Sequence, residues 1–383
     1  MKRLLGALLA VQVALAAQPG LAADAAWEPW QKITGIIDVD GPRTDGSLIV
    51  AGSAALYLVD PSGKVTPFAR GPGGYRDDAG TEAYLAMSPG GTVSAAGCSF
   101  TPDDTFLLRL HIPIGINRVS ASGDESGSFA NLTGVTTLNG IAFDTTGSFD
   151  RRLLVSGRLG SKTVIFAIDC NGDVKVITRS APVLEGGLAV APSTFGAFGG
   201  ALIAPDELSG KIYAITAAGA VRVVAKPSLK VGADIGVESV GFVPAGFITR
   251  GGAAYYPDRL SPGSPHPGSN SLLRLTSAQL GAAGVHDGDL FAATEGGALV
   301  VAVRCAASCT TIPVVAATKA HGEGHIAFTV APAPPTPTPT PTPPRIDATD
   351  PNSALRLGGA IAIGALVVVA LIAAVATLRR RRR

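Results

Sequence analysis

The sequence predicts an all-β fold, a β-propeller with six blades or, as the alternative, five, followed by one C-terminal transmembrane helix. Two repeated patterns within residues 24–331 predict the propeller: a strand-turn-strand unit, and a short apolar strand with a small residue near its centre. The 48 Gly and 28 Pro among 383 residues disfavour long helices. An uncharged apolar segment near the C-terminus predicts the membrane helix.

Residues 1–23 have the pattern of a secretory signal peptide. Lys2 and Arg3 precede an apolar run that ends at Ala17, and small residues follow it. This run is too short to cross a bilayer, which favours a cleaved leader over a buried helix of the fold. We therefore expect residues 24–331 to fold outside the cytoplasm.

The strand-turn-strand unit is clearest in three copies that align without gaps and carry a glycine at the same position of the turn. These copies are Leu56–Val65, Ile165–Val174 and Ile212–Val221. Weaker copies begin at Leu107, Leu272 and Leu299. Six hairpins in about 300 residues predict six blades of four strands. The last two copies begin only 27 residues apart, which leaves five blades open.

The second pattern, a small residue between apolar ones, is typical of crowded inner strands near a propeller axis. Its copies are Tyr84–Met87, Gly140–Phe143, Gly187–Val190, Val240–Phe242 and His325–Phe328. No hairpin follows the final copy, so we expect it to join the first blade, near Leu48, and close the ring. A β-sandwich is the alternative fold, which the regular repetition disfavours.

All four cysteines lie in the segment expected outside the cytoplasm, where disulfides form. Cys305 and Cys309 are separated by a three-residue turn, and we predict a disulfide across a hairpin. A metal site there would need two further ligands. Cys98 and Cys170 either pair with each other or remain buried thiols.

The C-terminal region predicts a tether and an anchor. Residues 332–356 begin with a Pro/Thr repeat that is typical of a semi-rigid polyproline II stalk. Residues 357–378 carry no charge and are long enough, at roughly 33 Å as a helix, to cross a membrane once. The basic tail, residues 379–383, is expected in the cytoplasm. The protein is thus expected in the cell membrane as a single-pass protein with its N-terminal domain outside.

The formal net charge of +2 conceals an acidic centre, because seven of the 31 basic residues lie at the two ends of the chain. The remaining 24 basic and 29 acidic residues give −5. Without basic clusters to neutralise phosphates, the sequence argues against a nucleic acid partner.

A carboxylate or amide lies shortly before the small residue of each inner strand. These residues are Glu82, Asn139, Glu185, Glu238 and Glu323. In a propeller they are expected at one mouth of the central channel, where several oxygen ligands suit a Ca²⁺ ion. The alternative is that each side chain accepts backbone N–H bonds at the start of its own strand.

Other motifs give weaker signals. His321 and His325 are four residues apart, but the intervening glycines oppose a helix, so a zincin motif is excluded and only a loop metal site remains. The segment that starts at Asp38 favours a polar turn, and Asp206 and Glu207 are expected to be solvated loop charges. No nucleophile elbow, phosphate-binding loop or dinucleotide fingerprint is present in the sequence.

The segment Leu138-Asn-Gly-Ile-Ala-Phe-Asp144, with the strand from Arg152 and the Ile165 hairpin, resembles a blade of the regucalcin and gluconolactonase superfamily. This resemblance implies a six-bladed propeller with a divalent cation in its channel and, in some members, lactone or ester hydrolysis. The family's Pro-Asn-Gly motif would map onto Asn139, with leucine in place of the proline. Its Asp-Gly-Leu-Ala motif would map onto Glu185, with one extra glycine. Interaction propellers of the NHL type share much of this pattern.

These observations favour a membrane-anchored binding module for an extracellular protein, glycan or small ligand. The alternative is a calcium-dependent hydrolase of the lactonase or esterase type, in which the channel cation polarises a carbonyl oxygen and activates water. The sequence leaves open whether the protein is an enzyme, with binding favoured.

Overall fold

The computed structural model describes residues 25–77 and 82–333. The predicted signal peptide, the stalk beyond residue 333, the predicted transmembrane helix and the basic tail lie outside the described residues. Within the described ranges, no helix has the length and apolar character needed to cross a membrane.

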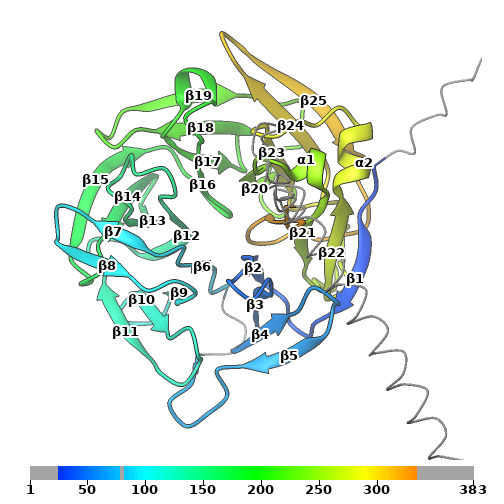
Figure 1. Ribbon diagram of the computed structural model, residues 1–383. Coiled ribbons are helices and arrows are strands. Elements are labelled where there is room, and N and C mark those ends of the chain that lie inside the picture. Colours follow the sequence, from blue (N-terminus) through cyan, green and yellow to red (C-terminus); the bar gives the residue numbers. More distant parts are fainter. Residues whose placement is uncertain (1–24, 78–81, 334–383) are drawn as a thin grey trace, which may run out of the picture. The chain divides into compact units, whose positions relative to one another are not determined.

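Six four-stranded antiparallel sheets are arranged as blades around a central axis (Figure 1). The predicted all-β propeller with six blades is therefore confirmed, and the five-bladed alternative is wrong. The sheets, both disulfides and the hydrophobic clusters of the described residues lie between Ala25 and Val330. This segment thus contains a complete ring with its own core, and it belongs to one compact unit that ends at Pro332.

Each blade has an inner strand at the ring axis and an outer strand at the rim. In order from inner to outer strand, blades 1 and 2 contain β2 (Asp38–Asp40), β3 (Leu48–Gly52), β4 (Ala55–Val59) and β5 (Val65–Phe68), then β6 (Leu85–Met87), β9 (Thr105–Arg109), β10 (Gly115–Val119) and β11 (Ser126–Asn131). Blades 3 and 4 contain β12 (Thr137–Phe143), β13 (Leu153–Leu159), β14 (Lys162–Ile168) and β15 (Val174–Ala181), then β16 (Ala189–Val190), β17 (Leu202–Asp206), β18 (Lys211–Ile215) and β19 (Val221–Ala225). Blades 5 and 6 contain β20 (Val237–Phe242), β23 (Leu290–Thr294), β24 (Val300–Cys305) and β25 (Cys309–Val315), then β26 (Ala327–Val330), β21 (Gly252–Asp258), β22 (Ser271–Thr276) and β1 (Glu28–Lys32).

Blades 5 and 6 are interleaved along the chain. After β20, the chain forms helix α1 (Phe247–Arg250) and supplies β21 and β22 to blade 6. It then forms helix α2 (Ser277–Ala282), returns to complete blade 5, and ends in β26 on blade 6. The Leu272 copy belongs to blade 6 and the Leu299 copy to blade 5. Their short separation in the sequence therefore does not reduce the number of blades.

Blade 6 closes the ring with strands from both ends of the described chain. The N-terminal β1 pairs with β22, and the C-terminal β26 pairs with β21. The prediction that the last copy joins the first blade near Leu48 is wrong. Blade 1 has its own inner strand, β2, whereas the hairpin β21–β22 has none until β26 arrives.

Strand β2 begins at Asp38, in the segment for which the sequence favoured a polar turn. Both aspartates of this strand are bound across to the next inner strand: Asp38 accepts the Leu85 N–H at 2.7 Å, and Asp40 accepts the Met87 N–H at 2.7 Å. A strand with only one apolar residue is therefore fixed by polar contacts, which a hydrophobic pattern does not reveal.

The second strand of a blade is buried along its whole length in four of the six blades, in β3, β9, β17 and β23. A neighbouring blade covers each of the two faces of these strands, which explains their continuous apolar runs. Aromatic side chains fill one such interface, where Phe106 packs edge-on against Phe100 and Phe143.

Both cysteine pairs form disulfides. Cys305 and Cys309 close the β24–β25 hairpin, as predicted. Cys98, in β8 (Cys98–Phe100), is bonded to Cys170 in the β14–β15 turn, which resolves the alternative that the sequence left open. Strand β8 pairs with β7 (Gly91–Val93) in a hairpin inserted between β6 and β9, so this disulfide joins blade 2 to blade 3.

Candidate functional site

The inner strands begin at one mouth of the ring and end at the other. The first mouth collects glutamates from the loops that precede the inner strands, from the start of β20 and from the turns after β17 and β23. We call it the glutamate mouth, and it contains Glu82, Glu185, Glu207, Glu238, Glu295 and Glu323. The opposite mouth, where the inner strands end, is called the apolar mouth.

The five residues predicted as metal ligands lie at the glutamate mouth, and four of them are hydrogen-bonded there to one another or to Tyr84. The Asn139 amide donates to Glu185 at 3.2 Å. The Tyr84 hydroxyl contacts both Glu238, at 2.9 Å, and Glu323.

The fifth predicted residue, Glu82, is exposed and is bound by the Arg259 guanidinium, which also lies 3.2 Å from Glu323. The structure thus brings the five residues to one mouth. Asn139 contacts Glu185 directly, whereas Glu82, Glu238 and Glu323 are linked through Tyr84 and Arg259.

Burial dominates the electrostatics of this mouth. Glu238 is 2% exposed, and burial followed by the charges of Glu323 and Glu295 holds its pKa well above the ordinary value. Burial and neighbouring carboxylates raise the pKa of Glu207 and of Glu323 to about 8 in each case. Several carboxyl groups are therefore partly protonated near neutral pH unless a cation compensates their charge.

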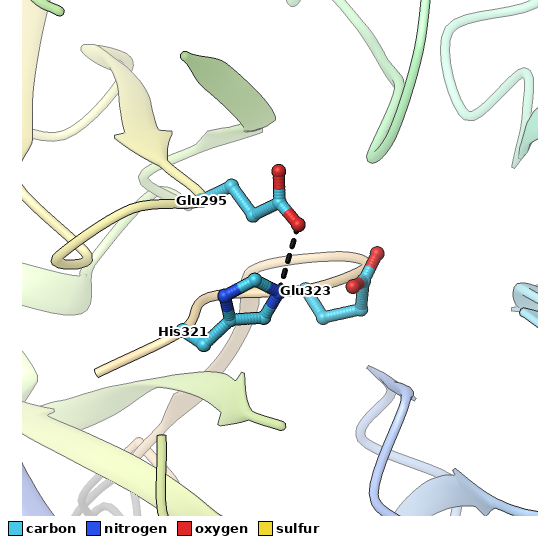
Figure 2. A group of neighbouring side chains, drawn as sticks. All are labelled: Glu295, His321 and Glu323. Atoms are coloured by element: carbon cyan, nitrogen blue, oxygen red, sulfur yellow. Dashed lines mark ion pairs between the residues drawn. The ribbon is translucent and has the colours of Figure 1, made fainter. Parts of the chain in front are cut away.

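Glu295, His321 and Glu323 form the tightest group of potential metal ligands at this mouth (Figure 2). One ligand atom from each residue lies within 4.8 Å of the others, and all three residues are buried. His321 Nε2 lies 2.8 Å from a Glu295 oxygen, whereas its Nδ1 is buried without a hydrogen-bond partner.

This group fits a divalent metal ion. Two carboxylates and an imidazole form a donor set that Zn²⁺ and Mn²⁺ accept, whereas Ca²⁺ prefers six to eight oxygens. A cation would also relieve the repulsion between the neighbouring carboxylates.

Sequence reasoning named His321 as part of a loop metal site but assigned no site role to four other residues of the mouth: Tyr84, Glu207, Arg259 and Glu295. Glu207, expected to be a solvated loop charge, is only 6% exposed. It and Glu295 follow second strands, and the turns after second strands reach the same mouth as the loops before inner strands. His321 lies two residues before Glu323, and this His-Gly-Glu spacing was the one available signal.

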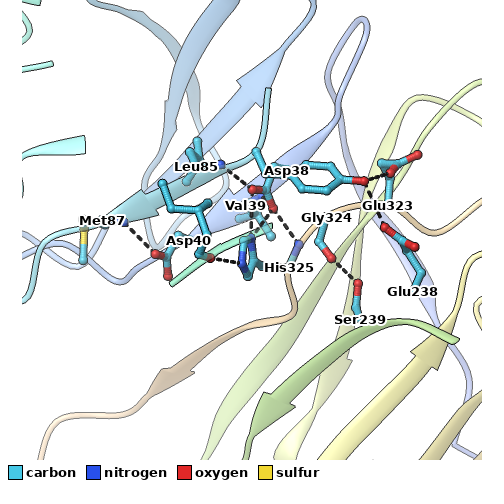
Figure 3. A network of polar contacts seen from close by, with 12 residues as sticks. Asp38, Val39, Asp40, Leu85, Met87, Glu238, Ser239, Glu323, Gly324 and His325 are labelled. Atoms are coloured by element: carbon cyan, nitrogen blue, oxygen red, sulfur yellow. Dashed lines mark hydrogen bonds and ion pairs between the residues drawn. The ribbon is translucent and has the colours of Figure 1, made fainter. Parts of the chain in front are cut away.

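A layer of polar contacts separates the two mouths at the centre of the ring (Figure 3). His325, just before β26, lies with Nδ1 2.9 Å from an Asp38 oxygen and with Nε2 2.7 Å from the Ile141 carbonyl oxygen. Both partners are acceptors, so the imidazole donates from both nitrogens and is positively charged. Burial lowers the pKa of His325, but the buried Asp38 carboxylate outweighs it and raises the pKa to about 9.

The likenesses of this chain to known proteins are likenesses of structure alone. No family model matches the sequence, and no curated protein sequence matches it. Among solved structures, a catalytically inactive virginiamycin B lyase from Staphylococcus aureus with quinupristin is 14% identical, with a TM-score of 0.43 and 78% of each chain covered. A putative gluconolactonase is 13% identical, with a TM-score of 0.44 and coverage of 79% of this chain and 87% of that chain. A streptogramin B lyase is 13% identical, with a TM-score of 0.41 and coverage of 80% and 95%. The fold assignment rests on the six sheets and not on these likenesses.

Proposed function

We propose that this protein is a binding and recognition module, anchored in the cell membrane by its C-terminal segment, with its propeller outside the cytoplasm. The glutamate mouth is its recognition site, and a divalent cation held there by Glu295, His321 and Glu323 takes part in binding. The ligand is an extracellular protein, glycan or small molecule.

One observation carries this proposal: six glutamates, most of them buried, converge with a histidine at one mouth of the ring. Buried carboxylates with raised pKa values reduce the stability of a fold, and such groups concentrate at functional sites. The described chain ends after β26, at the opposite mouth, because inner strands end there. A tether that begins at Pro332 thus starts away from the glutamate mouth.

The cation is tested by thermal unfolding of residues 25–333 after treatment with a chelator. Mn²⁺, Zn²⁺ and Ca²⁺ are added separately, and a cation that binds the folded state alone stabilises it by about 2.7 kcal/mol at a hundredfold excess over its dissociation constant. We expect stabilisation by at least one of them, lost in Glu295→Gln and in Glu323→Gln. Glu125→Gln, at an exposed position in the β10–β11 turn, is the matched control. If no cation changes the melting temperature, the metal part of the proposal is wrong.

Recognition is tested with glycan and peptide arrays probed by the same proteins. The proposal is supported if wild type and Glu125→Gln bind a ligand that Glu295→Gln and Glu323→Gln no longer bind. A ligand that the mouth variants retain with unchanged affinity places recognition elsewhere on the propeller. For the membrane arrangement, an impermeant amine-reactive label applied to intact cells should modify propeller lysines such as Lys175, which is exposed.

A metal-dependent hydrolase is the second candidate function. The specific observation in its favour is the pairing of His321 with Glu295 beside Glu323, because a histidine oriented by a carboxylate is a common proton acceptor in catalysis. A cation bound there would supply a Lewis acid for a carbonyl oxygen. In this function, Glu295 orients the imidazole, and the positive Arg259 stays beside the carboxylates of Glu82 and Glu323.

Lactone and aryl ester hydrolysis by the metal-loaded propeller tests this candidate. Because His321 is also one of the proposed cation ligands, His321→Gln is assayed at cation concentrations that saturate the variant. Turnover that is still lost under these conditions would support catalysis by His321. If the metal-loaded propeller hydrolyses no substrate faster than chelator-treated Glu125→Gln does, the hydrolase candidate is wrong and only the binding function remains.

A further inference from the structure

The apolar mouth opens into a cavity of about 500 Å³ on the ring axis. Each of the six inner strands contributes to its wall, with residues at or near its C-terminal end. Representative residues are Asp40, Met87, Phe143, Val190, Phe242 and Val330. A volume of this size is typical of sites for small organic ligands.

The cavity has an unusual combination of an apolar wall and one carboxylate. Among the described residues that line it, Asp40 and His325 are the only ionisable ones. His325 has both ring nitrogens engaged, one by Asp38 and one by the Ile141 carbonyl, so it offers a ligand no free donor. The charge of its imidazolium is balanced by Asp38, which leaves the charge of Asp40 in excess.

Asp40 retains the capacity to bind a ligand. One of its oxygens accepts the Gly41 N–H and the other accepts the Met87 N–H, each at 2.7 Å. A carboxylate oxygen accepts two hydrogen bonds, so each oxygen keeps one free lone pair. The two backbone bonds also fix the orientation of the carboxylate at the cavity wall and favour its ionised form. A cationic donor would therefore meet a pre-oriented acceptor in a region of low dielectric.

We propose that this cavity binds a small molecule that combines an apolar body with one ammonium group, and that Asp40 receives the ammonium. The apolar body packs against the ends of the inner strands, and the ammonium donates to the free lone pairs of Asp40. The cavity lies at the mouth opposite to Glu295, His321 and Glu323, so this site is independent of the function proposed for the glutamate mouth.

The test compares an amine with a neutral molecule of the same shape. Binding of 2-phenylethylamine and of 2-phenylethanol to residues 25–333 is measured by titration calorimetry at pH 7. We expect the amine to bind at least about tenfold more tightly, because a hydrogen bond to a charged partner is worth more than a neutral one. Asp40→Asn should reduce this preference to about twofold or less, since it removes the charge but keeps an acceptor. Asp173→Asn, at an exposed turn, should leave it unchanged.

A second variant tests the cavity without altering its charge. Ala189 lies in the cavity wall, and Ala189→Leu should fill space and abolish binding of both molecules. This variant decides the matter if Asp40→Asn fails to fold. Equal affinity for amine and alcohol, an unchanged preference in Asp40→Asn, amine binding retained in Ala189→Leu, or no binding of either molecule at millimolar concentration would each overturn the proposal.

Discussion

His325 ties three blades together at the centre of the ring. It precedes β26 of blade 6, contacts Asp38 of blade 1 and donates to Ile141 of blade 3. Asp38 is fully buried, so removal of the imidazolium leaves an uncompensated buried carboxylate. Such a loss costs about 3–5 kcal/mol in other proteins.

We predict that His325→Gln lowers the free energy of unfolding by an amount of this order at pH 6. The folded pKa of about 9 lies above the ordinary value of 6.5. The stability that the protonated form contributes is therefore complete below pH 6.5 and is lost as pH rises through 9. Chemical denaturation at pH 6, 8 and 10 measures both effects. The difference between wild type and variant should shrink with rising pH, and His286→Gln, at an exposed position, should show neither effect.

Glu207 gives a second pH dependence, in a different window. Its folded pKa of about 8, raised by burial and by Glu295, exceeds the ordinary value of 4.5. Without metal, the stability contributed by the protonated form is complete below pH 4.5 and is lost as pH rises through 8. We predict that Glu207→Gln makes the chelator-treated protein more stable than wild type at pH 8.5, by about 1 kcal/mol or more, and not at pH 4.5. Thermal unfolding at the two pH values measures this, and a variant that is less stable at pH 8.5 would contradict it.

The two disulfides act on elements at different distances along the chain. Cys98–Cys170 joins residues 72 apart in neighbouring blades, whereas Cys305–Cys309 joins residues four apart in one hairpin. In the chain-entropy description, the longer loop restricts the unfolded chain more.

We predict that Cys98→Ser with Cys170→Ser lowers the free energy of unfolding by about 4 kcal/mol, and Cys305→Ser with Cys309→Ser by about 2 kcal/mol. Denaturant titration of the two double variants measures the difference. Equal losses, or a larger loss from the short loop, would show that strain in the folded state outweighs the entropy of the unfolded chain.

Elements with an apolar or turn signature were predictable from the sequence, and those fixed by long-range polar contacts were not. The three aligned hairpins became β4–β5, β14–β15 and β18–β19, because alternation and a turn glycine are local signals. Strand β2 was missed, since the contacts of its aspartates that fix it in the sheet come from Leu85 and Met87, far along the chain. At the glutamate mouth, the residues before inner strands were found, whereas Glu207 and Glu295 follow second strands and required the topology.

Closure of the ring depends on β1, the outermost strand of blade 6. Its loss would expose the edge of β22 and remove the contacts of Trp30 with Tyr255 and Arg274.

We predict that residues 37–333, which lack β1, have a lower melting temperature than residues 25–333 and a greater tendency to aggregate. Differential scanning calorimetry and light scattering measure the two effects. A synthetic peptide of residues 25–36, added in excess, should restore part of the stability, because β1 is joined to the ring by strand pairing and not by a disulfide. An unchanged melting temperature would show that three strands suffice for blade 6.

The pairing of β26 with β21 determines how the domain responds to tension. A pull on the chain at Ala331 acts along β26, whose hydrogen bonds to β21 lie across the direction of force and are loaded together in shear. His325, at the far end of this strand, transmits the load to blades 1 and 3 through Asp38 and Ile141. Because β26 lies at the ring axis among the other inner strands, it has less freedom to peel away than a strand at the rim. The domain is therefore built to resist mechanical extraction from the end at which the sequence predicts an anchor.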